Sequence, residues 1–355
     1  MEEKNINRSE PLLQWFWQHK RDLPWREDRN PYHVWISEIM LQQTRIEAVM
    51  KYYRRFTEAL PDVASLAAVE DDVLLKLWEG LGYYSRARNL KKAAQTIMTE
   101  YGGVFPDTYA ELRKLSGIGD YTAGAIASLC FNERVPAVDG NVLRVISRLT
   151  GSRKNVLLPE TKKTVTEQLQ QIMPEEAGAF NEALMELGEI VCMPNGEPDC
   201  LHCPLQEQCT AFREQLTAEL PVRIKQQKRR SENKTVLLLV APDGTVAIEK
   251  RGQKGLLSGM YQLPNVEGFL DETALAALLE EWELSPERVS PLREAKHVFT
   301  HIDWFMRGYL VLAGQRSGRF FWVTPRELRE AYALPTAFQK LLPADFTNLN
   351  IEGIV

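Results

Sequence analysis

The sequence has no apolar run long enough to span a bilayer, few cysteines and no excess of basic residues. Its N-terminal stretch, MEEKNINRSE, is polar and lacks the apolar centre of a secretory signal peptide. We therefore expect a cytoplasmic protein without a membrane partner. The net charge of −5 over 355 residues excludes a strong overall basic field as the basis of nucleic-acid binding. Any such binding must depend on local geometry and on local basic clusters.

A change of periodicity along the chain predicts two domains. Helical patterns with almost no strand signal fill residues 1–220, in the stretches 9–30, 32–56, 62–101 and 142–190. A polar, basic segment at 221–233 is typical of a linker. Beyond it, β-rich runs flank Pro242-Asp243-Gly244, and others at 296–312 and 319–323 follow a helical run at 273–282. We expect an all-α domain at 1–220 and an α+β domain at 234–355.

Two glycines mark a tight hairpin before a helix rich in small residues. Gly117 and Gly119 have no Cβ, so main-chain N–H groups there can approach a ligand closely. The helix N-terminus that follows adds partial positive charge, which predicts an anion or phosphate site. Asp139 stands at the start of the next helix. It is either an N-cap or a catalytic carboxylate beside a captured phosphate backbone.

Glu38 is a carboxylate on an apolar helical face. Its neighbours at helical spacing are Val34, Trp35 and Leu41. Burial there disfavours the charged form and raises the pKa of the carboxyl. Glu38 is therefore either a structural residue, paired with a cation such as Arg45, or a general acid.

Amide and aromatic side chains near helix breaks are candidate base contacts. Gln42 and Gln43 carry amides that can read base edges or fill a vacated place in a base stack. Trp25 and Arg26 form an adjacent pair in a loop, and Tyr83 lies between glycines and arginines. Such aromatic residues either stack on bases or pack in the core.

Four of the five cysteines cluster in one loop. Residues of this type so close together in a cytoplasmic chain indicate a metal site rather than disulfides. The spacing Cys-x7-Cys-x2-Cys-x5-Cys suits a [4Fe–4S] cluster or zinc and does not choose between them. The four are Cys192, Cys200, Cys203 and Cys209, whereas Cys130 lies alone in an apolar helix and is expected in the core.

These motifs together resemble one protein family. The segments LSGIGDYTAGAI, VDGNVLRV, SEIMLQQT and WEGLGYYSRARNL, with the cysteine loop, resemble the helix-hairpin-helix DNA glycosylases, and among them the adenine DNA glycosylases of the MutY type. The resemblance implies that 1–220 is the catalytic domain, with the hairpin at about 115–123. It implies a [4Fe–4S] cluster held by the loop at 192–209, and a MutT-like (Nudix-like) lesion-recognition domain at 234–355.

The resemblance also implies catalytic roles. Glu38 matches the acid that protonates adenine N7, and Asp139 matches the carboxylate that stabilises the oxocarbenium-like sugar or bonds to it transiently. Tyr121 and Asn141 match supporting polar groups. Endonuclease III-like relatives carry a lysine after the hairpin, and that lysine forms a Schiff base with the sugar. Tyr121 occupies this position and cannot do so, which implies hydrolysis without a lyase step.

Further positions are implied to contact DNA, and one implied function of the C-terminal domain is absent. The helix LAALLEEWEL keeps Glu280 and Glu281 but lacks the arginine and first glutamate of a Nudix metal site, so no magnesium is expected there. Of two glutamates in one helix, Glu182 is the one implied to contact adenine, and Glu186 is the alternative for that contact. The implied contacts are Trp25, Arg26, Leu41, Gln43 and Glu182 for adenine, Gln42 and Tyr83 for the opened duplex, Gly117 and Gly119 for phosphate, and Phe299, Thr300 and His301 for the lesion.

The expected activity is excision of adenine mispaired with 8-oxoguanine or guanine. The expected partner is double-stranded DNA, bound by a monomer that associates with the nucleoid through DNA. Two alternatives remain at this stage. One is a glycosylase of the same fold that removes thymine or an oxidised pyrimidine, and the other is a non-catalytic damage-binding protein.

Overall fold

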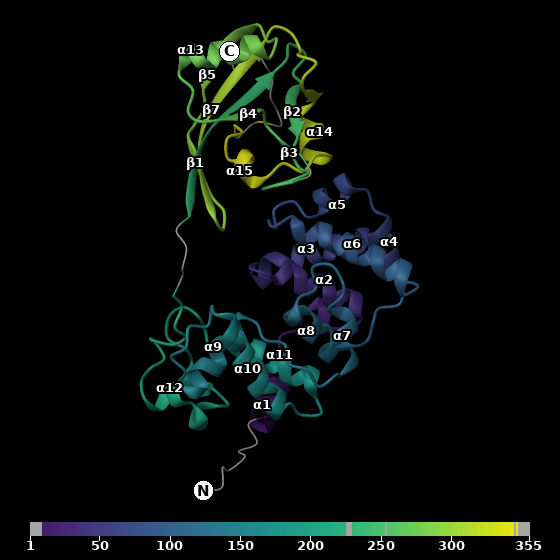
Figure 1. The fold of residues 1–355 in the computed structure, drawn as a ribbon, viewed down its shortest axis with the longest axis vertical. Coiled ribbons are helices and arrows are strands. Elements are labelled where there is room, and N and C mark those ends of the chain that lie inside the picture. The colour runs from purple at the N-terminus through teal and green to yellow at the C-terminus, as the bar shows by residue number, and fades with distance from the viewer. Residues whose placement is uncertain (1–8, 225–228, 253, 344–345, 347–355) are drawn as a thin grey trace. The chain divides into compact units, whose positions relative to one another are not determined.

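A computed structural model of the chain describes residues 9–224, 229–252, 254–343 and 346. Contacts divide the chain into two compact units (Figure 1). The first, the helical unit, comprises Met1–Ala68 and Arg88–Gln226. The second, the sheet unit, comprises Gln227–Val355 together with Val69–Ala87. None of the helices in the described part is both long and apolar enough to cross a membrane.

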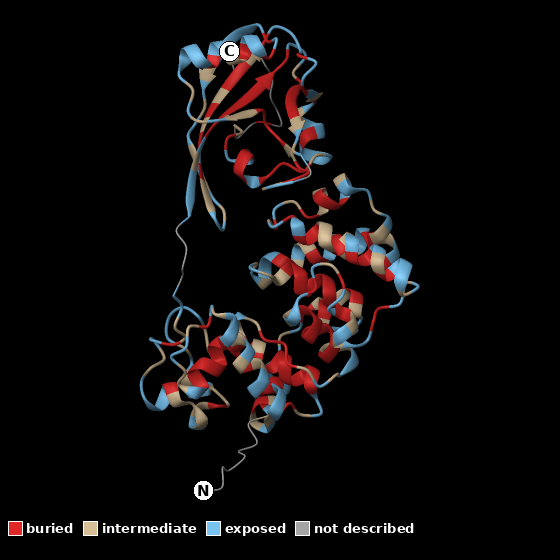
Figure 2. Cartoon of the chain, viewed as in Figure 1, coloured by how far each residue is buried: buried red, intermediate tan, exposed pale blue. Residues whose placement is uncertain are grey.

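The helical unit is built around α11, which is buried along most of its length and packs against α1, α8 and α9. Buried residues are concentrated along its inner helices (Figure 2), and its core contains large side chains such as Phe16, Phe180 and Leu184. The helices are α1 (Ser9–His19), α2 (Pro31–Leu41), α3 (Ile46–Ala59), α4 (Val63–Ala68), α6 (Ser85–Glu100), α7 (Tyr109–Leu112), α8 (Asp120–Phe131), α9 (Gly140–Thr150), α10 (Pro159–Ile172), α11 (Ala177–Ile190) and α12 (Thr210–Arg213).

Two predicted helical stretches are more broken than the sequence pattern indicated. The stretch 32–56 contains the separate helices α2 and α3, because the backbone leaves the helical conformation at Gln42, with ψ of 108°, and at Gln43, with φ of 61°. The stretch 62–101, where two helices were expected, contains α4, α5 (Asp71–Leu77) and α6. Gly80 and Gly82, with φ of 98° and 69°, form the loop between α5 and α6, as a glycine break predicts.

The sheet unit contains one mixed sheet with strand order β3-β2-β1-β7-β5. The long strand β1 is parallel to β7 along its whole length and antiparallel to β2, which follows it through the predicted Pro-Asp-Gly hairpin. β1 begins at Arg230, inside the segment predicted as a linker, of which 225–228 lie outside the described residues. The strands are β1 (Arg230–Val240), β2 (Val246–Lys250), β3 (Tyr261–Gln262), β4 (Asn265–Glu267), β5 (Pro286–Pro291), β6 (Ala295–Val298), β7 (Ile302–Ala313) and β8 (Phe321–Val323).

Both faces of this sheet are covered. Successive residues of β1 alternate between two clusters, with Leu237 and Leu239 in one and Val236, Leu238 and Val240 in the other. α13 (Glu272–Glu281) contributes to the first cluster and α15 (Thr336–Gln339) to the second, and α14 (Pro325–Glu330) begins with a capping box. This explains why β1 reads as a continuous apolar run rather than as an alternating strand.

Candidate active site

The glycine hairpin joins α7 to α8 and leaves the start of α8 open. Gly117 has φ of 77°, and a Cβ there would lie 2.6 Å from Cβ of Asn89. Gly119 is the N-cap of α8 and has no neighbouring atom within 4 Å of where a Cβ would stand. Asp120 is held by Arg113 at 2.6 Å, which offsets the repulsion between its carboxylate and an approaching phosphate. The local geometry therefore fits the predicted anion site.

Glu38 lies on α2 and is 5% exposed, as its apolar neighbours predicted. The hydroxyl of Tyr121, from α8, donates a hydrogen bond to Glu38 Oε2 at 2.5 Å. Burial raises the pKa of Glu38 to about 7, the Tyr121 hydrogen bond opposes that rise, and the nearby Asp139 charge adds to it. Glu38 is thus a carboxyl that holds its proton close to neutral pH.

Asp139 is the N-cap of α9. Its Oδ1 accepts a hydrogen bond from Val142 N at 2.8 Å, and its Oδ2 accepts one from Asn141 Nδ2 at 3.0 Å. Burial raises the pKa of Asp139, and hydrogen bonds from the backbone of Val142 and Asn141, with the charge of Arg144, oppose the rise. The capping interpretation of Asp139 is therefore confirmed, and the same carboxylate is electrostatically coupled to Glu38.

Asn141 links Asp139 to the cysteine loop. Its Oδ1 accepts a hydrogen bond from Arg144 Nη2 at 2.8 Å, and Arg144 Nε donates to the carbonyl of Cys192 at 2.7 Å. α11 can approach Asn141 this closely because residue 188 is glycine, since a Cβ there would lie 2.6 Å from Cβ of Asn141. Arg144 was not singled out from the sequence. The one sequence feature that could have identified Arg144 is its place among apolar residues of a helix, because a buried arginine is unusual.

Arginines and glutamates form a network beside Glu38. Arg26 Nε donates to Glu182 Oε1 at 2.9 Å, and Arg26 Nη2 donates to Glu186 Oε2 at 2.8 Å. Glu186 also accepts from Arg21 Nε at 2.6 Å, and Arg29 Nη2 lies 2.6 Å from Glu182 Oε2. Glu182 and Glu186 are both almost fully buried, so both alternatives for the pocket glutamate belong to one network.

One atom of this network is not satisfied by a hydrogen bond. Among the described residues, no donor is aligned to hydrogen-bond the buried Oε2 of Glu182, despite the nearby guanidinium of Arg29. The ion pair with Arg29 offsets the cost of burying this oxygen, and its hydrogen-bonding capacity is left for a donor from a ligand. Arg21 and Arg29 were missed in the sequence, because their partners lie in α11, far along the chain.

The other predicted contact residues are dispersed between buried and exposed positions. Trp25 is 5% exposed and packs edge-on against Tyr53, which agrees with the core interpretation. Gln42 and Gln43 follow α2, and the second of these is exposed. Leu41 is partly buried at the end of α2.

The remaining predicted DNA contacts lie in the sheet unit. Tyr83 is 45% exposed, and its hydroxyl lies 2.6 Å from Oγ1 of Thr300. Phe299 packs against Trp304, while Thr300 and His301 are exposed in the turn between β6 and β7. The structure therefore brings Tyr83 and the 299–301 turn together within one unit.

The four clustered cysteines lie in one loop after α11, and each is partly buried. Three of them, Cys192, Cys203 and Cys209, pack against the helical core. Burial raises the pKa of Cys203 to about 12, and the other three thiols, which lie near it, also raise it. The buried Arg148 donates from Nη1 to Cys192 Sγ at 3.3 Å.

The chemistry of this donor set fits an iron–sulfur cluster. Four cysteines can supply four thiolate ligands, and the buried guanidinium of Arg148 would offset part of their negative charge. In the described part of the chain, no three of these side chains are gathered in metal-binding geometry, so the structure does not itself show the cluster.

Comparisons with known proteins identify both units. Residues 36–175 match the HhH-GPD superfamily of base excision DNA repair proteins, and residues 235–344 match the NUDIX domain. The chain is 33% identical to an adenine DNA glycosylase of Rattus norvegicus, over 93% of this chain and 76% of the relative. It is 30% identical to an adenine DNA glycosylase of Buchnera aphidicola subsp. Baizongia pistaciae, over 86% of each.

A solved structure supports the assignment of the helical unit. The structure of a thermostable thymine-DNA glycosylase superposes with a TM-score of 0.55 at 28% identity, covering 60% of this chain and 100% of that one. The expected Nudix-like region in the C-terminal part is confirmed. Because adenine DNA glycosylases match at 30% identity or more over most of both lengths, the chain belongs to the adenine DNA glycosylase family, the base excision repair hydrolases that cleave the N-glycosidic bond of adenine in DNA.

Proposed function

We propose that this enzyme removes adenine mispaired with 8-oxoguanine or guanine, with Glu38 as the general acid and Asp139 as the carboxylate facing the sugar. The observation that carries the proposal is the buried Glu38 carboxyl, whose pKa burial raises to about 7 against the Tyr121 hydrogen bond, with a further rise from Asp139. Two coupled carboxyls with different environments are the pattern expected of an acid and an electrostatic partner.

The chemistry needs both groups. Adenine leaves poorly as an anion, so its departure requires a proton, which protonated Glu38 would give to N7. The sugar develops positive charge as the bond breaks, and an ionised Asp139 would stabilise it or bond to it transiently. Oε2 of Glu182, a buried oxygen without an aligned donor among the described residues, would accept a hydrogen bond from the exocyclic amine of adenine.

Tyr121 supports the acid rather than acting on the sugar. Its hydroxyl donates to Glu38, so it orients the carboxyl. A phenol cannot form an imine with the sugar. The proposed reaction therefore hydrolyses the glycosidic bond and ends at an intact abasic site, with no strand cleavage through a Schiff base. Asn141 holds Asp139 Oδ2 and would keep that carboxylate aimed at the sugar.

DNA would be held by the hairpin and opened by base flipping. The uncovered N-terminus of α8 at Gly119 offers main-chain N–H groups to a phosphate. Gln42 and Tyr83 would enter the duplex as the nucleotide leaves the stack, and Trp25, Arg26, Leu41 and Gln43 would line the adenine pocket. Gln43 already has an exposed side chain on a left-handed backbone at the end of α2.

Four cysteines would hold a [4Fe–4S] cluster. When bound, the cluster would supply four iron–thiolate bonds that tie the loop at 192–209 to the helical core. Arg148 would donate to Cys192 Sγ, as it does in the present structure. Iron and acid-labile sulfide measured per chain distinguish this cluster from zinc, and about four of each are expected.

Removing the hydrogen-bonding groups of the 299–301 turn should weaken lesion preference. In Thr300→Ala with His301→Ala, we expect the ratio of single-turnover rates for A opposite 8-oxoguanine and A opposite guanine to fall about tenfold, as the loss of one or two hydrogen bonds predicts. Both side chains are exposed, so folding should be unaffected. An unchanged ratio would refute the lesion-reading role of this turn.

The pH profile should report the proton on Glu38. Because the acid must be protonated, the single-turnover rate should fall as pH rises through about 7, the pKa that burial gives Glu38. Well above that pH the fall should approach about tenfold per unit. Rates measured from pH 5 to pH 9 under saturating enzyme test this, and a rate that rises through neutrality would contradict the acid role.

One assay tests the proposed function against its alternatives. Single-turnover cleavage is measured on duplexes with A opposite 8-oxoguanine, T opposite G, and an oxidised pyrimidine, with and without later alkali. We expect release of adenine only, and strand breaks only after alkali. Release of thymine would favour the activity named for the similar solved structure. The absence of any release would leave a damage-binding protein.

A further inference from the structure

The segment Val69–Ala87 precedes most of the helical unit in sequence, yet its contacts place it in the sheet unit. It contains α5 and the loop of Gly80 to Tyr84 that carries Tyr83. The sequence placed this segment in the first domain. Tyr83 meets Thr300 in the sheet unit, so the side chains that attach this segment there also position Tyr83.

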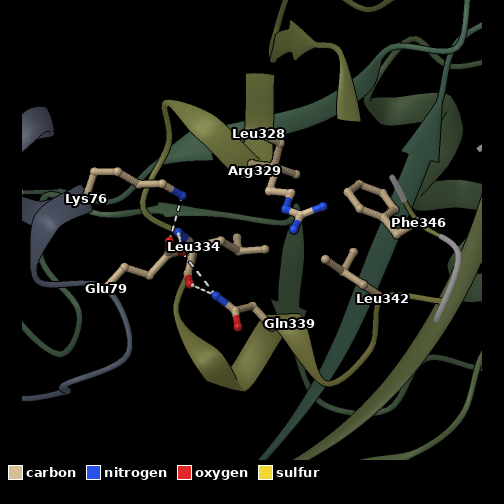
Figure 3. A pocket seen from close by; sticks show the side chains of 8 residues that line it. All are labelled: Lys76, Glu79, Leu328, Arg329, Leu334, Gln339, Leu342 and Phe346. Atoms are coloured by element: carbon tan, nitrogen blue, oxygen red, sulfur yellow. Dashed lines mark hydrogen bonds and ion pairs between the residues drawn. The ribbon is translucent and has the colours of Figure 1, made fainter. Parts of the chain in front are cut away.

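Glu79 is the centre of that attachment (Figure 3). Its Oε1 accepts hydrogen bonds from Leu334 N at 2.9 Å and from Gln339 Nε2 at 3.1 Å. Its Oε2 accepts one from Lys76 Nζ at 2.6 Å, and the same ammonium donates to the carbonyl of Tyr332 at 3.1 Å. One carboxylate therefore joins α5 to the backbone between α14 and α15.

Hydrogen bonds of Glu79 and Lys76 contribute to this contact. Glu79 borders a cavity of about 240 Å3 in the sheet unit, and the side chain is only partly buried. Leu334 lies beside Glu79, whereas Leu342 and Phe346 line the opposite side of the cavity (Figure 3). Since the space beside Glu79 is open, loss of its carboxylate exposes the Leu334 N–H to water instead of leaving a buried void.

Asp72 makes a second attachment at the other end of α5. Its Oδ1 lies 2.7 Å from Lys250 Nζ and its Oδ2 accepts from the Tyr261 hydroxyl at 3.2 Å. Lys250 also stands over the Tyr261 ring at 5.1 Å. The two attachments fix both the start and the end of the α5 segment on the sheet unit.

The loop between Glu79 and Tyr83 is braced from within. Arg86 Nη2 donates to the carbonyls of Leu81 and Gly82 at 3.0 and 3.1 Å. Its guanidinium lies over the rings of Trp78 and Tyr83, at 5.3 and 5.6 Å. A loop held in this way is rigid, so a shift of Glu79 also shifts Tyr83.

We propose that Glu79 is a positioning residue, through which the sheet unit holds Tyr83 in register with the Thr300 turn and so sets the preference for 8-oxoguanine opposite adenine. The inference rests on the proposed roles of Tyr83 and Thr300 in the opened duplex and at the lesion. Glu79 itself touches neither adenine nor the sugar. Its removal should change which partner base is favoured and leave the bond-breaking step intact.

The test measures single-turnover rates for A opposite 8-oxoguanine and A opposite guanine in matched variants. In Glu79→Ala, the ratio of the two rates should fall about fivefold to fiftyfold, as for a contact group that is misplaced but present. The rate for A opposite guanine should stay within about twofold. Glu79→Gln keeps an acceptor oxygen and should recover part of the ratio. Glu330→Gln, which loses an exposed pair with Arg326 in the same unit, should change nothing.

A charge exchange keeps the test decisive if Glu79→Ala folds poorly. Asp72→Lys should lower the ratio, and adding Lys250→Asp should restore it, because the pair is re-formed with opposite sense. A ratio that is unchanged in all single variants, or equal losses on both duplexes without rescue, would overturn the positioning role. Failure of the proposed function is distinguishable, because the unaltered enzyme would then release no adenine or show no preference.

Discussion

Glu38→Gln should reduce adenine release by about 10²–10⁴-fold, the usual contribution of a general acid. Glutamine keeps the size of the side chain and can still accept the hydrogen bond that Tyr121 donates. It cannot deliver a proton to N7. Binding of the lesion duplex should stay within about tenfold of the unaltered enzyme, because the role we propose for Glu38 is at the base and not at the DNA backbone.

Base release and duplex binding are measured separately, the first by single-turnover quench and the second by titration of a duplex with an uncleavable adenine analogue. Glu133→Gln is the matched control, because Glu133 accepts a hydrogen bond from Tyr109 N at 2.6 Å elsewhere in the helical unit. If binding collapses in Glu38→Gln but not in the control, Glu38 has a structural role instead.

The two-unit organisation was accessible from the sequence because it depends on local patterns. Helical periodicity, the Pro-Asp-Gly hairpin of β1 and β2, and the apolar run of β1 each arise from residues close in the chain. The burial of Glu38 was accessible for the same reason, since its neighbours in the helix decide it.

Long-range partners were not accessible. Arg21 and Glu186 are separated by 165 residues, and no spacing rule pairs them. Arg144 acts on Asn141 and on the Cys192 carbonyl from inside an amphipathic helix whose pattern only indicates packing. The attachment of α5 to the sheet unit was hidden likewise, because Glu79 appears in sequence as an ordinary charge before a glycine loop.

The Gln43 position shows how a local pattern can mislead. Apolar spacing continues from α2 into α3, so periodicity predicts one helix. Gln42 ends α2, and Gln43, with positive φ, follows it and exposes a side chain that the family resemblance places at the adenine. Backbone strain of this kind persists where the surrounding structure imposes it, and this is frequent at functional sites.

Asp139→Asn should reduce adenine release by about 10³-fold or more, since it removes the negative charge that we propose stabilises the developing cation. The substitution preserves the helix cap, because asparagine is as good an N-cap as aspartate and can still accept from Val142 N. Its new amide would face the Nδ2 of Asn141, a donor that formerly pointed at the carboxylate. Loss of activity with folding retained is therefore expected.

Asp271→Asn separates charge from capping. Asp271 caps α13 by accepting from Ala274 N at 2.8 Å, the same arrangement as Asp139 on α9, and its change should leave release unaffected. Thermal melting and lesion-duplex binding, which should stay within about tenfold, are measured beside the single-turnover rate. If the Asp139→Asn variant releases adenine at close to the normal rate, the function of Asp139 is to cap α9 and its charge has no part in catalysis. If instead release is lost while melting and binding match the control, the charge itself acts on the sugar, because the cap is present in both proteins.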